Sequence, residues 1–209
     1  ASGITSTPDQ SWLEERKQKS RDKASALEPP HRLGGVRVVL VSPKFASNVG
    51  AVARACDCFE APQLYIVSPR CDPKSDEAFM VGTGSYVLQD AVVTDSLGEA
   101  LADCTGAIGF TRRQGAVRNV AESVSELLAK NPATLSRPRG APVALVFGRE
   151  EHGLFDDELA MCGLACSIPT GRSQPSLNLS HAVSVALSQW FEAARRADPD
   201  ASGVGGAGA

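Results

Sequence analysis

The sequence predicts an α/β protein with a parallel sheet and helices on both of its faces. Short runs of β-branched and other apolar residues alternate with segments of helical periodicity along most of the chain. Strands separated by helices at this spacing run parallel, because each helix carries the chain back across the sheet. The chain has 209 residues, of which 43% are hydrophobic, and this suffices for one domain with a proper core.

The expected elements follow one another in order. Strands are predicted at 36–41, 64–67, 91–93, 106–110, 143–147 and 165–168. Helices are predicted near 48–58, 96–102, 119–129 and 156–161 and from 176–180 onward, and a segment near 74–81 leads through 82–84 to the third strand. Ser47 or Asn48 is expected to cap the first of these helices, and Asn178 or Ser180 the last. The last helix has one apolar stripe, formed by Leu179, Val183, Ala186, Leu187 and Trp190.

Composition divides the chain into a charged, flexible N-terminal extension at 1–34, a core domain at 35–196 and a flexible Gly/Ala tail at 197–209. Residues 14–24 are dense in both signs of charge, which fits a solvated helix or a disordered arm better than a dedicated RNA contact. The first eight residues contain no acid and begin with Ala1. They are either the remnant of a chloroplast or mitochondrial transit peptide or the trimmed end of a cytoplasmic protein.

Charge and composition exclude several classes of protein. The net charge is −3 and the pI is about 5.7, so any RNA contact has to use local basic patches. The apolar runs are too short for a membrane span, and we expect a soluble intracellular protein. The six cysteines form no Cys-x-x-Cys pair and the three histidines are scattered, so we expect reduced thiols and no metal. Glycine-rich motifs for dinucleotides or nucleoside triphosphates are also missing.

Ligands of parallel α/β sheets bind at the carboxyl ends of the strands, where loops begin at Ser42, Phe110, Phe147 and Ile168. In the helix after the first loop, Asn48 and Arg54 are six residues apart, or two steps of three, so both side chains could point at one place. The alternative is that Asn48 is a cap and Arg54 a surface arginine. A glycine follows Phe147 directly and would let backbone approach a ligand closely. The last loop brings polar side chains and unpaired amides to a helix N-terminus, as a cap alone would also do.

A basic region lies between residues 111 and 140. Only Glu122 and Glu126 oppose its six cations, which are Arg112, Arg113, Arg118, Lys130, Arg137 and Arg139. A solvated helix face and a patch for the phosphate backbone of a nucleic acid are equally good interpretations, since the region starts at a strand end. If it is a patch, Arg112, Arg113 and Arg118 are its candidate RNA-binding residues.

Three motifs stand at the ends of these strands in a fixed order. They are Asn48-x-Gly50-x-x-x-Arg54, Phe147-Gly148-x-Glu150-x-x-Gly153-Leu154, and Ile168-Pro169 followed by Ser176-Leu177-Asn178-Leu179-Ser180-x-Ala182. Together they resemble the motifs of the SpoU-type (TrmH-like) branch of the SPOUT methyltransferases, over about residues 36–195. The segments at 147–150 and 109–113 are most similar to the TrmJ-like subgroup, which methylates tRNA anticodon loops.

The resemblance implies a fold, a reaction and an assembly. The fold would be an α/β domain with a C-terminal deep trefoil knot. The reaction would be methyl transfer from S-adenosyl-L-methionine to a ribose 2′-hydroxyl in structured RNA, most of all in tRNA, with ribosomal RNA as the second candidate. The family works as a homodimer with a shared active site. The alternative is a non-catalytic SPOUT-fold RNA-binding subunit of a larger ribonucleoprotein assembly, and the complete set of motif residues favours the enzyme.

The resemblance also implies roles for particular residues. The catalytic residues would be Arg54, Asn48, Ser176 and Asn178. The cofactor-binding residues would be Phe110, Thr111, Arg112, Gly148, Glu150, Ile168, Ser176, Leu177 and Asn178. A guanidinium is an awkward base because it stays protonated in proteins. We therefore expect Arg54 to clamp the substrate and to stabilise the developing alkoxide, an effect of ~2–4 kcal/mol.

Overall fold

The computed structural model describes residues 10–26, 31–112, 120–135 and 140–198. Within these ranges the chain forms a seven-stranded sheet of order β3-β2-β1-β6-β4-β7-β5, and every neighbouring pair of strands is parallel. The strands are β1 (Val36–Val41), β2 (Gln63–Val67), β3 (Val92–Thr94), β4 (Gly106–Phe110), β5 (Val120–Ala121), β6 (Val143–Phe147) and β7 (Gly163–Cys166). The predicted fold class, a parallel α/β sheet, is confirmed.

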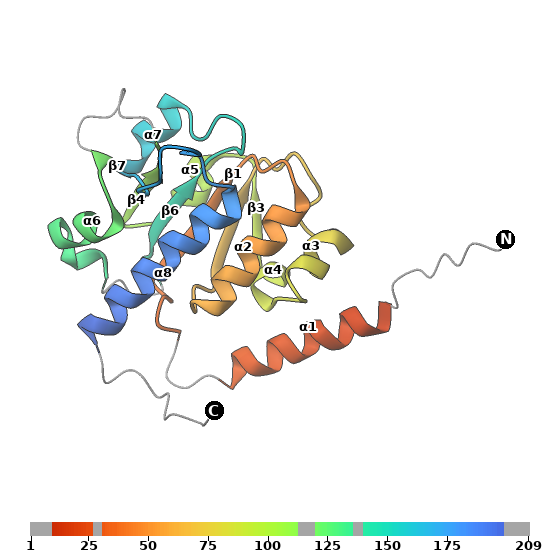
Figure 1. Ribbon diagram of the computed structural model, residues 1–209. Coiled ribbons are helices and arrows are strands. Elements are labelled where there is room, and N and C mark those ends of the chain that lie inside the picture. The colour runs from red at the N-terminus through yellow and green to blue at the C-terminus, as the bar shows by residue number, and fades with distance from the viewer. Residues whose placement is uncertain (1–9, 27–30, 113–119, 136–139, 199–209) are drawn as a thin grey trace.

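Helices cover both faces of this sheet (Figure 1). They are α1 (Gln10–Ser25), α2 (Ala46–Cys58), α3 (Asp76–Val81), α4 (Tyr86–Gln89), α5 (Leu97–Leu101), α6 (Val124–Lys130), the 3-10 helix η1 (Pro132–Thr134), α7 (Asp156–Cys162) and α8 (Leu179–Ala197). Figure 1 shows α2 and α8 packed side by side on one face. Leu97 of α5 and Leu159 of α7 belong to the core of the other face.

The two cores follow from the alternation of side chains along β1. Val38 and Leu40 belong to the larger core, which also holds Val52 of α2 and Trp190 of α8. Val39 and Val41 point to the opposite face and pack with the core of α5 and α7. A strand that is buried on both faces is expected to be apolar throughout, as the run Val36–Val41 is apart from Arg37.

The ends of several elements differ from those predicted. A helix was predicted near 119–129, but residues 120–121 form β5 and the helix α6 begins only at Val124. Ser123 sets that start, because its hydroxyl accepts a hydrogen bond from the backbone N–H of Glu126 at 3.1 Å. The last strand was predicted at 165–168 and lies at 163–166, since its partner β4 ends at Phe110 opposite Cys166.

The caps of the two helices that border the site are also resolved. Asn178 is the N-cap of α8, and its side-chain oxygen accepts from the backbone N–H of Ser180 at 2.8 Å. The prediction that Ser47 or Asn48 caps α2 is wrong. The helix begins earlier, at Ala46, and its N-cap Phe45 forms no side-chain cap bond. Instead, the carboxylate of Glu150, distant in sequence, accepts from the backbone N–H groups of the N-cap Phe45 and of Lys44 before it.

Residues 10–25 of the predicted N-terminal extension form α1. Of the two alternatives given for the charged segment, a helix or a disordered arm, the structure shows the helix. Its Leu13 is buried against the core. The tail beyond residue 198 and the acid-free segment at 1–9 lie outside the described residues, so the division of the chain at 34 and 196 stays a prediction. None of the helices in the described ranges combines the length and apolar character that a bilayer crossing requires.

Candidate active site

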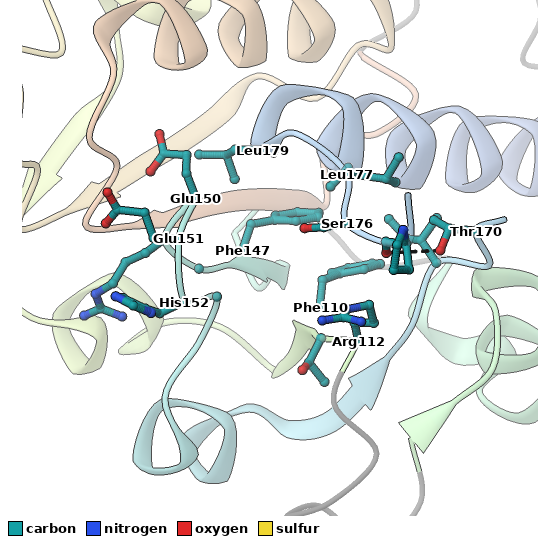
Figure 2. Close-up of a pocket in the computed structure, with 17 residues that line it drawn as sticks. Phe110, Arg112, Phe147, Glu150, Glu151, His152, Thr170, Ser176, Leu177 and Leu179 are labelled. Carbon is teal, nitrogen blue, oxygen red and sulfur yellow. Dashed lines mark hydrogen bonds between the residues drawn. The ribbon is translucent and has the colours of Figure 1, made fainter. Parts of the chain in front are cut away.

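A cavity of about 200 Å³ opens at the carboxyl edge of the sheet, where β4, β6 and β7 end (Figure 2). Three loops that are far apart in sequence form its walls. Residues 110–112 are the end of β4 and the loop after it, residues 147–153 are the end of β6 and the turn after it, and residues 168–182 lead from β7 into α8. Its lining comprises Phe110, Thr111, Arg112, Phe147, Gly148, Arg149, Glu150, Glu151, His152, Gly153, Ile168, Thr170, Pro175, Ser176, Leu177, Leu179 and Ala182.

Two phenylalanines make a flat apolar wall. Phe110 and Phe147 are the last residues of the neighbouring strands β4 and β6 and lie opposite each other in the strand register. Their rings stack at a centroid distance of 4.5 Å with an angle of 9° between the planes. Ile168 and Leu177 add apolar surface from the last loop. Such a slot suits a flat, aromatic ligand group, because it buries both of its faces without a polar cost.

The last loop also offers backbone groups to this slot. Ile168, Ser176 and Leu177 lie outside helices and strands, and in the described parts of the chain their backbone groups form no hydrogen bonds with other backbone groups. The hydroxyl of Thr170 donates to the carbonyl oxygen of Pro175 at 3.1 Å and closes the loop on itself. Free amide and carbonyl groups beside an apolar wall can bind the edge of a heterocycle.

A chain of hydrogen bonds joins the three motifs beside the cavity. The side-chain amide of Asn48 donates to Glu150 Oε1 at 2.9 Å. Asn178 in turn donates its amide to Asn48 Oδ1 at 3.0 Å, while its own Oδ1 accepts from Ser180. Residues 48, 150 and 178 thus form one polar network, although no two of them are near in sequence. The network fixes the start of α8 against the start of α2.

Glu150 lies at the N-terminus of α2. Its carboxylate oxygens accept from the backbone N–H groups of Lys44, at 3.1 and 3.2 Å, and of Phe45, at 3.4 Å. The first N–H groups of a helix lack partners inside the helix, and the positive end of the helix dipole favours an anion there. Only 11% of the Glu150 side chain is exposed. Its oxygens are therefore occupied by α2 rather than free to bind a ligand.

Two cations link the neighbouring carboxylate to the same loops. Glu151 pairs with Lys44 Nζ and, at 3.3 Å, with an Arg70 nitrogen. These cations lower the pKa of the Glu151 carboxyl, since they favour its charged form. Arg70 also donates from Nε to the carbonyl oxygen of Ser42 at 3.1 Å. The loops after β1, β2 and β6 are thus clamped together behind the cavity.

The arginines near the cavity have different partners. Arg149 forms two bonds with the carboxylate of Glu158, at 2.9 and 3.0 Å, and stacks over the ring of Phe155. Arg112 is exposed at the cavity and forms no ion pair with the described residues. It is therefore the arginine of this site that is open to a phosphate or carboxylate. Arg113 and Arg118 lie outside the described residues.

Arg54 and Asn48 do not point at the same place. Asn48 is buried in the polar network, whereas Arg54 is exposed on α2 and is not part of the cavity wall. Helix geometry explains the difference, because 3.6 residues complete one turn and each step of three therefore falls short by about 60°. Two such steps separate the side chains by about 120° around α2.

Of the residues that the resemblance assigned to the cofactor, eight line the cavity and Asn178 borders it through the polar network. Sequence reasoning did not name Phe147, His152 or Thr170 as site residues. Phe147 ends a predicted strand, as Phe110 does. Because adjacent parallel strands end at the same edge of a sheet, this shared position could have indicated that the two rings meet there. His152 stands in the second motif segment itself, so its neighbourhood was the signal.

Metal and thiol chemistry receive no support from the described ranges. In them no three His, Cys, Asp or Glu side chains gather in a way that would hold a metal ion. All six cysteines are free. Burial raises the pKa of Cys162 and of Cys166 to about 12, so these thiols stay protonated at neutral pH. They behave as small apolar residues, as predicted.

Comparison with known proteins gives one matching family model. The model of the SpoU rRNA Methylase family matches residues 35–188. Among curated proteins, the chain is 35% identical over 153 residues to the tRNA (cytidine/uridine-2′-O-)-methyltransferase TrmJ of Pectobacterium atrosepticum. That match covers 73% of this chain and 62% of the relative. The chain thus spans about three fifths of the length of the curated relatives it matches.

The solved structures that superpose on this chain include methylases as well. A probable methylase family protein from Haemophilus influenzae Rd KW20 superposes with a TM-score of 0.72 at 29% identity, over 80% of this chain and 70% of that one. TrmJ from Z. mobilis ZM4 superposes with a TM-score of 0.67 at 28% identity, over 75% and 69%. The sheet, the cavity and the three motif segments described above all lie within residues 35–188, which the family model matches.

Proposed function

This chain belongs to the SpoU rRNA methylase family, and on that premise we propose that it methylates a ribose 2′-hydroxyl of tRNA with S-adenosyl-L-methionine as cofactor. The observation that carries the proposal is the polar network Glu150–Asn48–Asn178, which joins all three motifs at one cavity. A cap or a surface arginine alone would not bring these segments together. The curated relatives, which are tRNA 2′-O-methyltransferases, add the substrate class, tRNA, and the 2′-oxygen as the acceptor.

The residues present fit the cofactor. Its adenine requires a flat apolar slot with hydrogen-bonding groups along one edge, and the stacked Phe110 and Phe147 stand beside the free backbone groups of Ile168 and Leu177. Arg112 faces the same cavity and can pair with the carboxylate of the methionine part. Ser176 contributes a hydroxyl. We propose that Glu150 holds α2 and Asn48 in place and does not bind the cofactor directly.

The bound cofactor supplies a methyl group already activated by a sulfonium, so no metal is required. The protein then has two tasks. It holds the ribose oxygen in line with the bond that breaks, at near-attack distance, which is the role we propose for Ser176 and Asn178, with Asn48 as the residue that positions Asn178. It also stabilises the charge that develops as the hydroxyl loses its proton. Arg54 performs this second task as a permanently charged donor, worth about 3 kcal/mol or roughly a hundredfold in rate.

Arg54 is exposed and outside its own cavity, and we therefore propose that it completes the site of a second copy in a homodimer. A two-fold dimer places the same surface of each protomer against the other, so each Arg54 would serve the partner's cavity. We also propose that residues after β7 form a trefoil knot. The sheet order supports it, because the late strand β7 lies between β4 and β5 while α8 returns to pack on α2.

The first test measures cofactor binding and methyl transfer with purified protein. Isothermal titration should show binding of S-adenosyl-L-methionine. Radiolabelled methyl should then enter tRNA in the presence of EDTA, at a ribose that resists alkaline cleavage, and a ribosomal RNA arm tests the second substrate. Cofactor binding without transfer to any RNA would instead favour the non-catalytic RNA-binding subunit. Loss of activity with EDTA that is restored by a divalent cation would contradict the metal-free mechanism.

The second test mixes two inactive variants. Arg54→Ala and Asn178→Ala should each be nearly inactive as homodimers. In a mixed dimer one cavity has its own Asn178 and the partner's Arg54 intact, and the other carries both lesions. Random exchange makes half of all dimers mixed, so activity should return to about a quarter of the wild-type level. If Arg54 served its own cavity, mixing would restore nothing once exchange had been verified by tagged subunits.

A further inference from the structure

Helix α1 lies outside the family match, which begins at residue 35, and yet it is seated on the core (Figure 1). Ser20 Oγ accepts a hydrogen bond from the backbone N–H of Tyr86 at 2.9 Å. Arg21 donates to Gln89 at 2.6 Å and to Asp90 at 2.9 Å. Leu13 is buried beneath the helix. Helix α1 is thus an added element with a specific position on the domain.

The core is shaped to receive this helix at Gly84. Gly84 has a φ of +72°, and a Cβ atom there would lie 2.8 Å from the backbone nitrogen of Lys17. No side chain fits between the two segments. The ammonium of Lys17 lies 4.3 Å from the centroid of the Phe79 ring, and Gln89 donates to the Lys17 carbonyl oxygen at 3.2 Å. Lys17 and Arg21 are therefore used in docking, not left for a partner.

The remaining basic residues of α1 form one exposed stripe. Trp12, Arg16, Lys19 and Lys23 follow at steps of four, three and four, which places them on one side of the helix. All four are exposed, and the Arg16 guanidinium lies 5.0 Å from the centroid of the Trp12 ring. In the described ranges none of the three cations forms an ion pair, although Glu14, Glu15 and Asp22 stand on the same helix.

This basic stripe borders the side of the domain that carries Arg54. Ser20 lies between the stripe and α2, because Arg16 and Lys23 are four residues before and three after it on the helix. Ser20 Oγ is 3.4 Å from an Asp57 oxygen. Asp57 follows Arg54 by three residues on α2, so both share one side of that helix. Helix α1 thus contacts α2 about one turn from Arg54.

We propose that the basic stripe of α1 binds the phosphate backbone of the RNA substrate, with Trp12 stacked on a base. The inference rests on the proposed function for the identity of the ligand. A protein of net charge −3 needs a local cationic surface to hold a polyanion. Three exposed cations, which form no ion pair with the described residues, and an exposed tryptophan supply the two interactions that sequence-tolerant RNA contacts use, which are charge neutralisation and stacking.

The test compares two triple variants with the same change in charge. The first is Arg16→Gln/Lys19→Gln/Lys23→Gln, and the matched control is Arg32→Gln/Arg195→Gln/Arg196→Gln, whose three cations lie at the C-terminal end of α8. Affinity for unmodified tRNA is measured by fluorescence anisotropy between 50 and 300 mM salt. Three lost phosphate contacts should reduce the slope of log K against log salt by about 2 to 3 and weaken binding roughly tenfold or more. The control should keep the wild-type slope.

Two further readouts separate binding from catalysis. The α1 variant should raise KM for tRNA while leaving kcat at saturating tRNA and the cofactor affinity unchanged. The chain has two tryptophans, and Trp190 is buried, so tRNA should quench the emission of Trp12. That quenching should vanish in Trp12→Phe, which reports on the stripe even if the triple variant loosens α1.

The outcomes distinguish this inference from the proposed function. Equal tRNA affinity and salt slope in the α1 variant and the wild type, together with unquenched Trp12 emission, would overturn the role of α1 even with methyl transfer intact. Binding of tRNA that depends on α1 but leads to no methyl transfer would support the stripe and contradict the proposed function alone.

Discussion

The carboxylate of Glu150 should contribute much more to stability than that of its neighbour Glu151. The perturbation is Glu150→Gln, which keeps the shape of the side chain and removes its charge. Glu150 is 11% exposed and accepts from the backbone N–H groups of Lys44 and Phe45, just before α2, and from Asn48, while Arg70 lies 4.0 Å away. Glu151 is 39% exposed and bonds to the side chains of Lys44 and Arg70. Glu151→Gln is therefore a matched control one residue away.

The magnitude follows from the bonds that change. A hydrogen bond to a charged group contributes about 1.5–3 kcal/mol, whereas a neutral one contributes about 0.5–1.5 kcal/mol. Neutralising Glu150 converts its hydrogen bonds to the weaker kind. In the wild type the Lys44 N–H contacts both carboxylate oxygens, and in the variant one of these oxygens is replaced by an NH₂ group that cannot accept from it. Loss of the interaction with the helix dipole adds about 0.3–1 kcal/mol. We expect a loss of about 2 kcal/mol in the free energy of unfolding.

The assay is thermal and urea denaturation of both variants beside the wild type. A loss of about 2 kcal/mol corresponds to a fall in Tm of roughly 4–8 °C for a chain of this size. Glu151→Gln should lose much less, since exposed ion pairs contribute little. Cofactor affinity should fall in Glu150→Gln as well, because Asn48 then holds Asn178 less firmly. Equal stability of the two variants would refute the assignment of Glu150 to the start of α2.

Two other predictions address the turn after β6 and the ion pair between buried Arg37 and exposed Asp103. Gly148→Ala should cost about 1–3 kcal/mol or more and abolish cofactor binding in titration calorimetry, because its Cβ would lie 2.0 Å from the Gly153 backbone, whereas Gly171→Ala, with nothing within 4 Å, should behave as wild type. Arg37 lowers the pKa of the Asp103 carboxyl, so the stability from this pair is present above the ordinary value near 4 and is lost as the pH falls below it. Urea melts of wild type and Asp103→Asn should therefore converge between pH 5 and 2, and a constant gap over that range would contradict the prediction.

The strands were predictable because burial on both faces leaves a signal that depends only on local sequence. The central strands β1 and β6 lie at the predicted residues 36–41 and 143–147. Helix α6 was placed too early, although Ser123 and Glu126 have the spacing of a capping box. The structure shows the bond to Ser123 Oγ, while the Glu126 carboxylate accepts from the backbone N–H of Glu122, one residue before the cap. The two-residue strand β5 has no such signal, since its pairing with β7 depends on where the rest of the sheet ends.

The candidate site was predictable at the level of loops but not of contacts. Topology alone brings the ends of β4, β6 and β7 to one edge of the sheet. Which polar groups meet there depends on distances between elements that the sequence does not contain. Glu150 and Asn48 are 102 residues apart, and the resemblance assigned Glu150 to the cofactor. In the structure Glu150 instead accepts from the backbone N–H groups of Lys44 and Phe45, just before α2.

Asn48 and Arg54 lie on different sides of helix α2, and this geometry favours a site that two protomers share. The side with Asn48 is buried and completes the polar network of its own protomer. The side with Arg54, about 120° away by helix geometry, is exposed and bears no ion pair within the described residues. A cation that acts on the ribose has to reach a cavity, and a rigid helix cannot turn both sides toward the same one. The second side is useful to catalysis only if another copy brings its cavity to it, which is why mixing Arg54→Ala with Asn178→Ala tests the assembly and the chemistry together.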